Sequence, residues 1–203
     1  MRLSKKQLAE VQNKPATRRI FPTAIIGIDP GANTALAVFA RVSDKRAGCG
    51  WPVGEGWVYV ETLDFWAAHD LILKSHPPEH TVLVIENGGL NSGTHHRADL
   101  AVRARLIGRY GVSDPERERR AQDKASQRVG AGNEHARLLL ARFRQKGYYA
   151  VEVKPTSAKL NRAEIEKLTG YSRKTNEHER DAIRLAHNNL YLLRVSTGIE
   201  VRI

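Results

Sequence analysis

The sequence has one cysteine and no long apolar run. Because Cys49 has no second cysteine to pair with, the chain can form neither an internal disulfide bond nor a cysteine-rich zinc site. No apolar stretch approaches the roughly 18 to 20 residues of a membrane-spanning helix, and the first residues lack the apolar core of a secretory signal peptide. We therefore expect a cytoplasmic protein in a reducing compartment, with no membrane partner.

Positive charge is the most informative feature of the composition. The 203 residues include 33 Lys and Arg against 22 Asp and Glu, which gives a formal net charge of +11 and a pI near 10.0. A field of this sign attracts polyanions, so nucleic acid is the expected partner. Hydrophobic residues make up 41% of the chain, which is ordinary for a folded protein, and the length fits one domain.

The N-terminal segment is basic. Glu10 is the only acid among its first 20 residues. We predict a basic arm over residues 1–22 that touches phosphates, followed by one folded domain over residues 23–203. The basic residues of the arm are Arg2, Lys5, Lys6, Lys14, Arg18 and Arg19.

Short apolar runs alternate with segments of helical spacing along the rest of the chain. This order predicts an α/β fold, a mixed five-stranded sheet flanked by helices. Asn176 and Glu179 form a capping box at the start of the last helix. The predicted strands are Ala24–Ile28, Ala35–Ala40, Gly56–Leu63, Thr81–Ile85 and Tyr148–Val153. The predicted helices are Phe65–Ser75, Arg97–Tyr110, Asn133–Lys146, Ala158–Thr169 and a last one from Asn176 to about Leu193.

Three acidic residues stand where they could meet. Asp29 and Glu86 each follow a buried strand, and both carboxylates emerge at one sheet edge if these strands are parallel neighbours. Asp181 lies in the first turns of the last helix, three residues after His178, so the two share a helical face. Two-metal phosphodiester hydrolysis needs several carboxylates around ions about 3.5 to 4 Å apart. Such oxygen ligands suit Mg²⁺ or Mn²⁺.

These motifs resemble those of RuvC-type Holliday-junction resolvases. Ile26-Gly27-Ile28-Asp29-Pro30-Gly31 is similar to their opening strand, Val84-Ile85-Glu86 to their second acidic strand, and His178-x-x-Asp181-Ala182 to their closing helix. The order and approximate separation of the motifs also agree. Many relatives have a carboxylate at the position of His178, and Asn87-Gly88-Gly89 also departs from the family. The departures indicate a divergent member, such as a phage-encoded one.

The resemblance implies a ribonuclease-H-like fold, a homodimer, and paired nicks across a four-way DNA junction. It implies two Mg²⁺ or Mn²⁺ ions and no small-molecule cofactor. His178 would ligate a metal ion or shuttle a proton, because an imidazole ordinarily titrates near neutral pH. Relatives often place a basic residue near the scissile phosphate; here we choose Lys159 over Lys154. The metal ligands and catalytic residues that the family implies are Asp29, Glu86, His178 and Asp181.

Other functions remain open at this point. A nuclease of the same fold could act on forks, flaps or RNA–DNA hybrids, and the chain could instead be a catalytically silent nucleic-acid-binding module. An ATPase of the actin and sugar-kinase type also has an Asp-x-Gly strand end, but 203 residues are too few for its two duplicated domains. Taken singly, Asp29 is also typical of a turn, Glu86 of a solvated strand end and His178 of an exposed helix.

Two further groups of residues have competing or ordinary interpretations. The nine basic residues from Arg97 to Arg128 could form a DNA track, or a solvated helix with ion pairs to the five interleaved acids. Five histidines match no zinc-ligand pattern, so we expect them in loops and on the surface. They are His69, His76, His80, His95 and His96.

Overall fold

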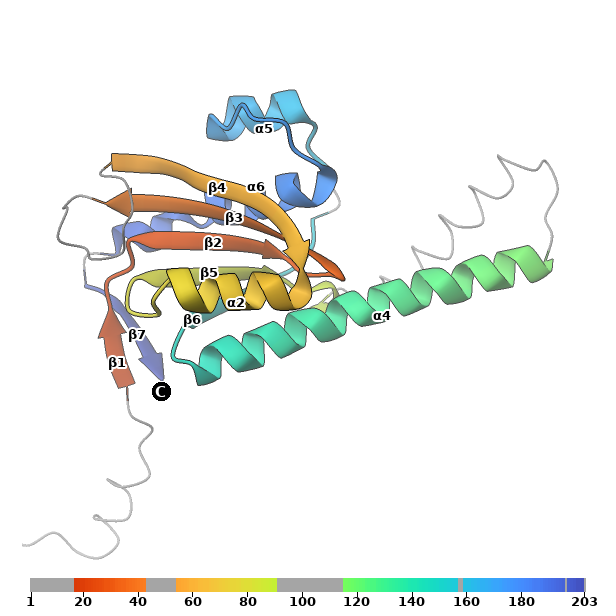
Figure 1. Cartoon of the computed structure of the whole chain (residues 1–203), viewed down its shortest axis with the longest axis horizontal. Coiled ribbons are helices and arrows are strands. Elements are labelled where there is room, and N and C mark those ends of the chain that lie inside the picture. Colours follow the sequence, from red (N-terminus) through yellow and green to blue (C-terminus); the bar gives the residue numbers. More distant parts are fainter. Residues whose placement is uncertain (1–16, 43–53, 91–114, 157–158, 196, 203) are drawn as a thin grey trace, which may run out of the picture.

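A mixed sheet of five strands forms the centre of the protein. The computed structural model describes residues 17–42, 54–90, 115–156, 159–195 and 197–202. The sheet strands are β2 (Ala24–Asp29), β3 (Asn33–Val42), β4 (Gly54–Asp64), β5 (Thr81–Glu86) and β6 (Tyr149–Val153). Their order is β4-β3-β2-β5-β6 (Figure 1). The first three pair antiparallel, whereas β2, β5 and β6 run parallel. The predicted five-stranded mixed sheet is confirmed.

Helices cover both faces of this sheet. Successive side chains of a strand point to opposite faces, and both faces of the central strands are apolar. On one face, Ile26 of β2 belongs to a core with the helices α2 (Phe65–Ser75) and α4 (Pro115–Gln145), whereas Ile25 on the other face packs with α6 (Glu177–Asn188). Figure 1 shows α2 and α4 on one side of the sheet and α6 on the other. Four of the five predicted flanking helices are thus present. They are α2 (Phe65–Ser75), α4 (Pro115–Gln145), α5 (Arg162–Thr169) and α6 (Glu177–Asn188).

The backbones of α6 and β2 approach each other directly at Gly27. A Cβ atom at Gly27 would lie 2.0 Å from the carbonyl oxygen of Ala182 and 2.8 Å from the amide nitrogen of Ala186. No other residue leaves room for this approach. Gly27 therefore sets the height of α6 above the sheet.

The helix boundaries agree with the prediction in part. α2 covers the predicted residues, but α4 has 31 residues and begins at Pro115 rather than near Asn133. α6 ends at Asn188 rather than near Leu193, because the 3-10 helix η3 (Leu190–Arg194) follows it. The predicted helix over residues 97–110 lies outside the described residues. Of the helices that the structure describes, none is both long and apolar enough to cross a membrane.

A second, two-stranded sheet joins the two ends of the described chain. β1 (Thr17–Ile20) pairs antiparallel with β7 (Ile199–Arg202). Each strand has four residues, too few for a clear alternating pattern, and neither was predicted. β1 falls within the segment predicted as a basic arm, and residues 1–16 of that segment lie outside the described residues.

Two histidines contradict the expectation of surface positions. His69 and His76 are buried, because both lie on or at the end of α2, whose inner face packs on the sheet. The Nε2 atom of His76 lies 2.8 Å from the Tyr59 hydroxyl. Burial lowers the pKa of His76 to about 4, so this side chain is neutral at physiological pH. His95 and His96 lie outside the described residues.

Candidate functional site

Asp29 and Glu86 lie at the same edge of the sheet. β2 and β5 are parallel neighbours, with Ile28 opposite Ile85 in the register. Asp29 and Glu86 are the residues that directly follow this pair. Their carboxylates therefore emerge at the same edge of the sheet. Both residues are half-buried.

The first turn of α6 is fixed by its cap. Asn176 accepts a hydrogen bond from the backbone N–H of Glu179, and the Glu179 carboxylate accepts one from the backbone N–H of Asn176. This is the predicted capping box. Thr62 of β4 ties the cap to the sheet, because its hydroxyl donates to Glu179 Oε1 at 3.0 Å and accepts from Asn176 Nδ2 at 2.9 Å. The turn that carries His178 is therefore held at the end of the sheet.

His178 contacts Asp29 across the gap between α6 and β2. Its Nδ1 atom lies 2.7 Å from Asp29 Oδ2. The His178 side chain is 61% exposed, whereas that of Asp29 is 14% exposed. The imidazole thus joins a largely buried carboxylate to solvent.

Asp181 is buried and held by two cationic side chains. Lys159 Nζ donates a hydrogen bond to Asp181 Oδ2, and Arg184 Nη2 lies 3.1 Å from Asp181 Oδ1. Lys159 Nζ also lies 3.3 Å from Glu177 Oε1. The side chains of Asp181 and Arg184 are 4% and 7% exposed, so water screens this pair little.

We call Asp29, Glu86, His178, Asp181 and Lys159 together the acidic edge. Desolvation raises the pKa of Asp29, although the hydrogen bond with His178 opposes this shift. Desolvation, with a contribution from the charges of Asp29 and Asp181, raises the pKa of Glu86 to about 7. Carboxylates whose charge is disfavoured by burial and by each other are typical of functional sites.

The donors of the acidic edge suit a hard divalent cation. Asp29, Glu86 and Asp181 offer carboxylate oxygens, His178 offers an imidazole nitrogen, and a bound cation relieves the repulsion among the carboxylates. Within the described part of the chain, no group of three or more His, Cys, Asp or Glu side chains is arranged to hold a metal ion. Binding would therefore require the side chains to rearrange, with Lys159 releasing Asp181.

The structure brings all five residues predicted from the sequence to this one edge. Asp29 pairs with His178, Asp181 pairs with Lys159, and the charges of Asp29 and Asp181 act on Glu86. Arg184 was missed, although its position three residues after Asp181 on the same helix was a usable signal.

α4 passes beside the acidic edge, which nothing in the sequence indicated. The Asn133 side chain fills the space over η2 (Gly88–Leu90), the turn that follows Glu86, and a Cβ atom at Gly88 would lie 2.5 Å from Asn133 Oδ1. A Cβ atom at Gly132 would lie 3.8 Å from the carbonyl oxygen of Pro30, just after Asp29. α4 therefore contacts the turns that follow both acid-bearing strands.

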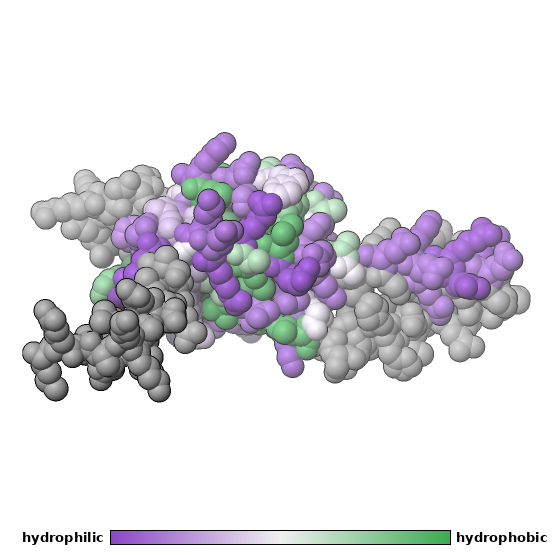
Figure 2. Space-filling view, turned by 90° about the horizontal axis from the view of Figure 1, so that it is seen from below, coloured by the Kyte–Doolittle hydropathy of each residue, from purple (hydrophilic) through white to green (hydrophobic). Residues whose placement is uncertain are grey.

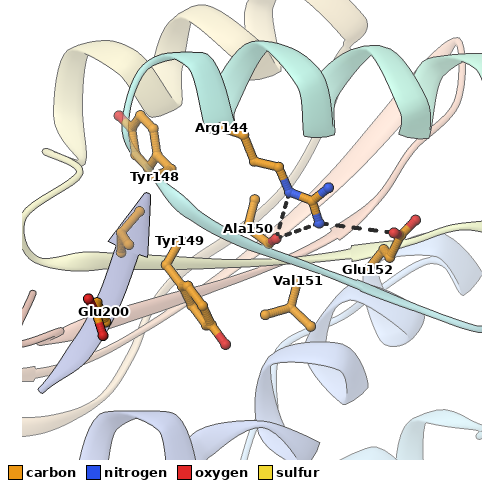
Figure 3. Close-up of a pocket in the computed structure, with 8 residues that line it drawn as sticks. Arg144, Tyr148, Tyr149, Ala150, Val151, Glu152 and Glu200 are labelled. Atoms are coloured by element: carbon orange, nitrogen blue, oxygen red, sulfur yellow. Dashed lines mark hydrogen bonds and ion pairs between the residues drawn. The ribbon is translucent and has the colours of Figure 1, made fainter. Parts of the chain in front are cut away.

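A pocket of about 560 Å³ lies elsewhere, along the outer edge of β6 (Figure 3). Arg144 crosses this edge and donates from Nε and Nη2 to the carbonyl oxygen of Ala150, at 3.2 and 3.0 Å. Its Nη2 atom lies 4.0 Å from Glu152 Oε1, and Glu200 of β7 also lines the pocket. None of the residues of the acidic edge lines it.

No protein-family model matches this chain, and no curated protein is significantly similar to it. The likeness to RuvC-type resolvases consequently depends on the acid-bearing motifs and on the positions that the fold gives them.

Proposed function

We propose that this chain is a metal-dependent endonuclease with a ribonuclease-H-like fold, of the Holliday-junction-resolving type. The observation that carries the proposal is the acidic edge, where carboxylates from β2, β5 and α6 gather, and where burial, together with the charges of Asp29 and Asp181, raises the pKa of Glu86. The five-stranded mixed sheet with helices on both faces supports the fold assignment. The RuvC-like motifs support the reaction class.

The residues of the acidic edge have distinct roles in this proposal. Asp29, Glu86 and Asp181 would hold one or two Mg²⁺ or Mn²⁺ ions, with His178 as a further ligand or as a proton shuttle. The chemistry that bound ions supply is polarisation of the scissile phosphate and activation of the attacking water. Because Nδ1 of His178 faces Asp29, its Nε2 is the atom left to exchange a proton with the reacting groups. Lys159, once released from Asp181, would neutralise charge that develops on the phosphate.

Branched DNA is the proposed substrate. The net charge of +11 favours nucleic acid of any kind, and the choice of four-way junctions comes from the resemblance alone. Symmetric cutting of a junction needs two active sites, so we propose a homodimer with an isologous interface. Binding that depends on phosphate contacts weakens steeply as salt concentration rises.

Cleavage of defined substrates tests this proposal. The purified protein is incubated with Mg²⁺, with Mn²⁺ or with EDTA, and with labelled four-way junction, fork, flap, duplex and RNA–DNA hybrid substrates. We expect metal-dependent, symmetric nicks, made preferentially in the junction. Glu86→Gln and Asp29→Asn should each lower the cleavage rate at least about 100-fold, because each removes a metal ligand.

Glu200→Gln serves as the matched control, because it removes an exposed acid in the pocket at β6 and should leave cleavage unchanged. Preferential cutting of forks, flaps or hybrids would retain the nuclease and reject the resolvase. Binding of junctions without metal-dependent cutting of any substrate would show a silent binding module instead.

A further inference from the structure

The first half of α4 extends away from the sheet. Ala136 is the first buried residue of the helix, and none of the described side chains in residues 116–135 is buried. Figure 1 shows this half running past the end of the sheet, and Figure 2 shows a hydrophilic surface at that end of the molecule. We call residues 115–132 the α4 extension. Because none of the described side chains of this half is buried, they gain little from the fold, which is typical of a helix that serves a polar partner.

Three of the four basic side chains that the structure describes in the α4 extension, all but Arg119, lie on one face. Arg117, Arg120 and Lys124 are exposed, and their spacing of three and four residues places them in one row along the helix. The sequence continues this spacing with Arg128. The described acids, Glu116 and Asp123, precede Arg117 and Lys124 by one residue each, so they lie to the side of the row.

The ion pair beside this row is weak. Arg120 Nη2 lies 3.3 Å from Glu116 Oε2, but the two side chains are 78% and 84% exposed. Exposed pairs of this kind contribute little to stability and exchange readily. A phosphate can therefore replace Glu116 at Arg120 at small cost.

The row starts a fixed distance from the acidic edge. α4 contacts the turns after Asp29 and Glu86 through Gly132 and Asn133. At 1.5 Å per residue, Lys124 and Arg117 lie about 14 and 24 Å from Asn133 along the helix axis. That span corresponds to roughly four to seven base pairs of duplex DNA.

We propose that the α4 extension binds the phosphate backbone of a duplex arm, with Arg117, Arg120 and Lys124 contacting phosphates roughly four to seven base pairs from the acidic edge. This inference rests on the proposed function, since it assigns the surface that holds the nucleic acid beside the acidic edge. Charge complementarity favours DNA over a second copy of this chain, because two basic rows repel each other.

The test compares two variants with the same change in charge. The first is Arg117→Gln/Arg120→Gln/Lys124→Gln, and the second removes the same charge from exposed positions at the other end of the molecule. Binding to a labelled junction is measured in EDTA over a range of salt concentrations, so that cleavage plays no part. The second variant is Lys74→Gln/Lys146→Gln/Arg194→Gln.

We expect the first variant to bind at least about tenfold more weakly, with a salt slope lower by about 2.7, and the second to bind like the unmodified protein. The loss should vanish on a junction of full-length arms in which uncharged methylphosphonates replace the phosphates roughly four to seven base pairs along each arm, since the row then has no charge to bind. Arg117→Lys/Arg120→Lys, which keeps the charge, should restore binding, and circular dichroism should show unchanged helix content.

Equal losses in the two variants, or an equal loss on junctions with charged and with neutralised arms, would overturn the inference. A shift in the monomer–dimer equilibrium of the first variant with an unchanged salt slope would assign α4 to a second copy instead. The proposed function fails separately, if the unmodified protein binds through α4 but cuts no substrate with Mg²⁺ or Mn²⁺.

Discussion

The acidic edge and the outer edge of β6 contain similar residues in different surroundings. At the acidic edge, the side chains of Asp181 and Arg184 are 4% and 7% exposed. At the outer edge, those of Arg144 and Glu152 are 52% and 37% exposed. Water screens the second pair, whereas burial at the first edge disfavours charge and contributes to the raised pKa of Glu86. Burial, and not residue type, therefore separates acids whose charge is disfavoured from an ordinary surface pair.

The pocket and the acids with raised pKa also lie in different parts of the molecule. The pocket of about 560 Å³ lies at the outer edge, where Arg144 covers the Ala150 carbonyl group of an exposed strand. Such cover protects an edge strand from pairing with other chains. The acids with raised pKa, Asp29 and Glu86, lie instead at the ends of β2 and β5.

We expect the largest effect on stability from a substitution at Gly27, where α6 packs directly on β2. Gly27→Ala would place a Cβ atom 2.0 Å from the Ala182 carbonyl oxygen, so α6 would have to move. We expect a loss of about 3 kcal/mol in the free energy of unfolding, measured by urea denaturation. Because α6 carries His178 and Asp181, the cleavage rate of the protein that remains folded should fall as well.

Gly56→Ala is the control for this substitution. Gly56 also lies in a strand of the sheet, but among the described residues, apart from its two chain neighbours, no heavy atom lies within 4 Å of a Cβ atom placed there. Its stability should be unchanged or slightly higher, since alanine restricts the unfolded chain. A Gly27→Ala protein with the stability and cleavage rate of the unmodified protein would show that the height of α6 does not position the site.

A gain of stability is expected when the crowding at the acidic edge is relieved. The raised pKa of Glu86 means that the folded protein binds this proton more tightly than the unfolded chain does. Stability therefore falls as pH rises from about 4.5 to about 7, and the cost persists above that range. Glu86→Gln removes this cost in stability. At pH 8 in EDTA the variant should therefore be more stable than the unmodified protein by about 2 kcal/mol, with no gain near pH 4.

Mg²⁺ should reverse this difference. Metal that binds the folded state stabilises the unmodified protein but not Glu86→Gln. Glu200→Gln, at the exposed outer edge, should change stability by less than about 0.5 kcal/mol under either condition. If Glu86→Gln were destabilising in EDTA at pH 8, the carboxylate would be engaged in a favourable contact and the crowding argument would be wrong.

Local patterns were sufficient to predict most of the sheet and to single out the three acids of the acidic edge, whereas Lys159 was chosen from the resemblance to RuvC-type resolvases. Asp29 and Glu86 end apolar runs, and Asn176 and Glu179 mark the start of α6, so each signal lies within a few residues of the feature it predicts. Whether the acids meet depends on β2 and β5 being parallel neighbours. The sequence allowed that arrangement, and the strand register establishes it.

Contacts between distant segments could not be predicted in this way. Asn133 reaches the turn after β5 only because α4 runs across the sheet, and β1 finds β7 from the other end of the described chain. His76 was assigned to the surface because it fits no zinc-ligand pattern, whereas its burial depends on Tyr59 and on the packing of α2. No local periodicity encodes such pairings.

The smallest effect should come from the outer edge. Arg144→Met keeps the length of the side chain but removes both hydrogen bonds to the Ala150 carbonyl group, which is then open to water. Because water can replace the lost donors, we expect a loss of only about 1 kcal/mol in the free energy of unfolding, and no change in the cleavage rate.

Size-exclusion chromatography of Arg144→Met should show more self-association, since the edge of β6 is uncovered. Arg144→Lys keeps the charge but lacks the paired donors, so its free energy of unfolding in urea should match that of Arg144→Met. A fall in cleavage by either variant would mean that the two edges are coupled through β5 and β6, and that burial alone does not separate them.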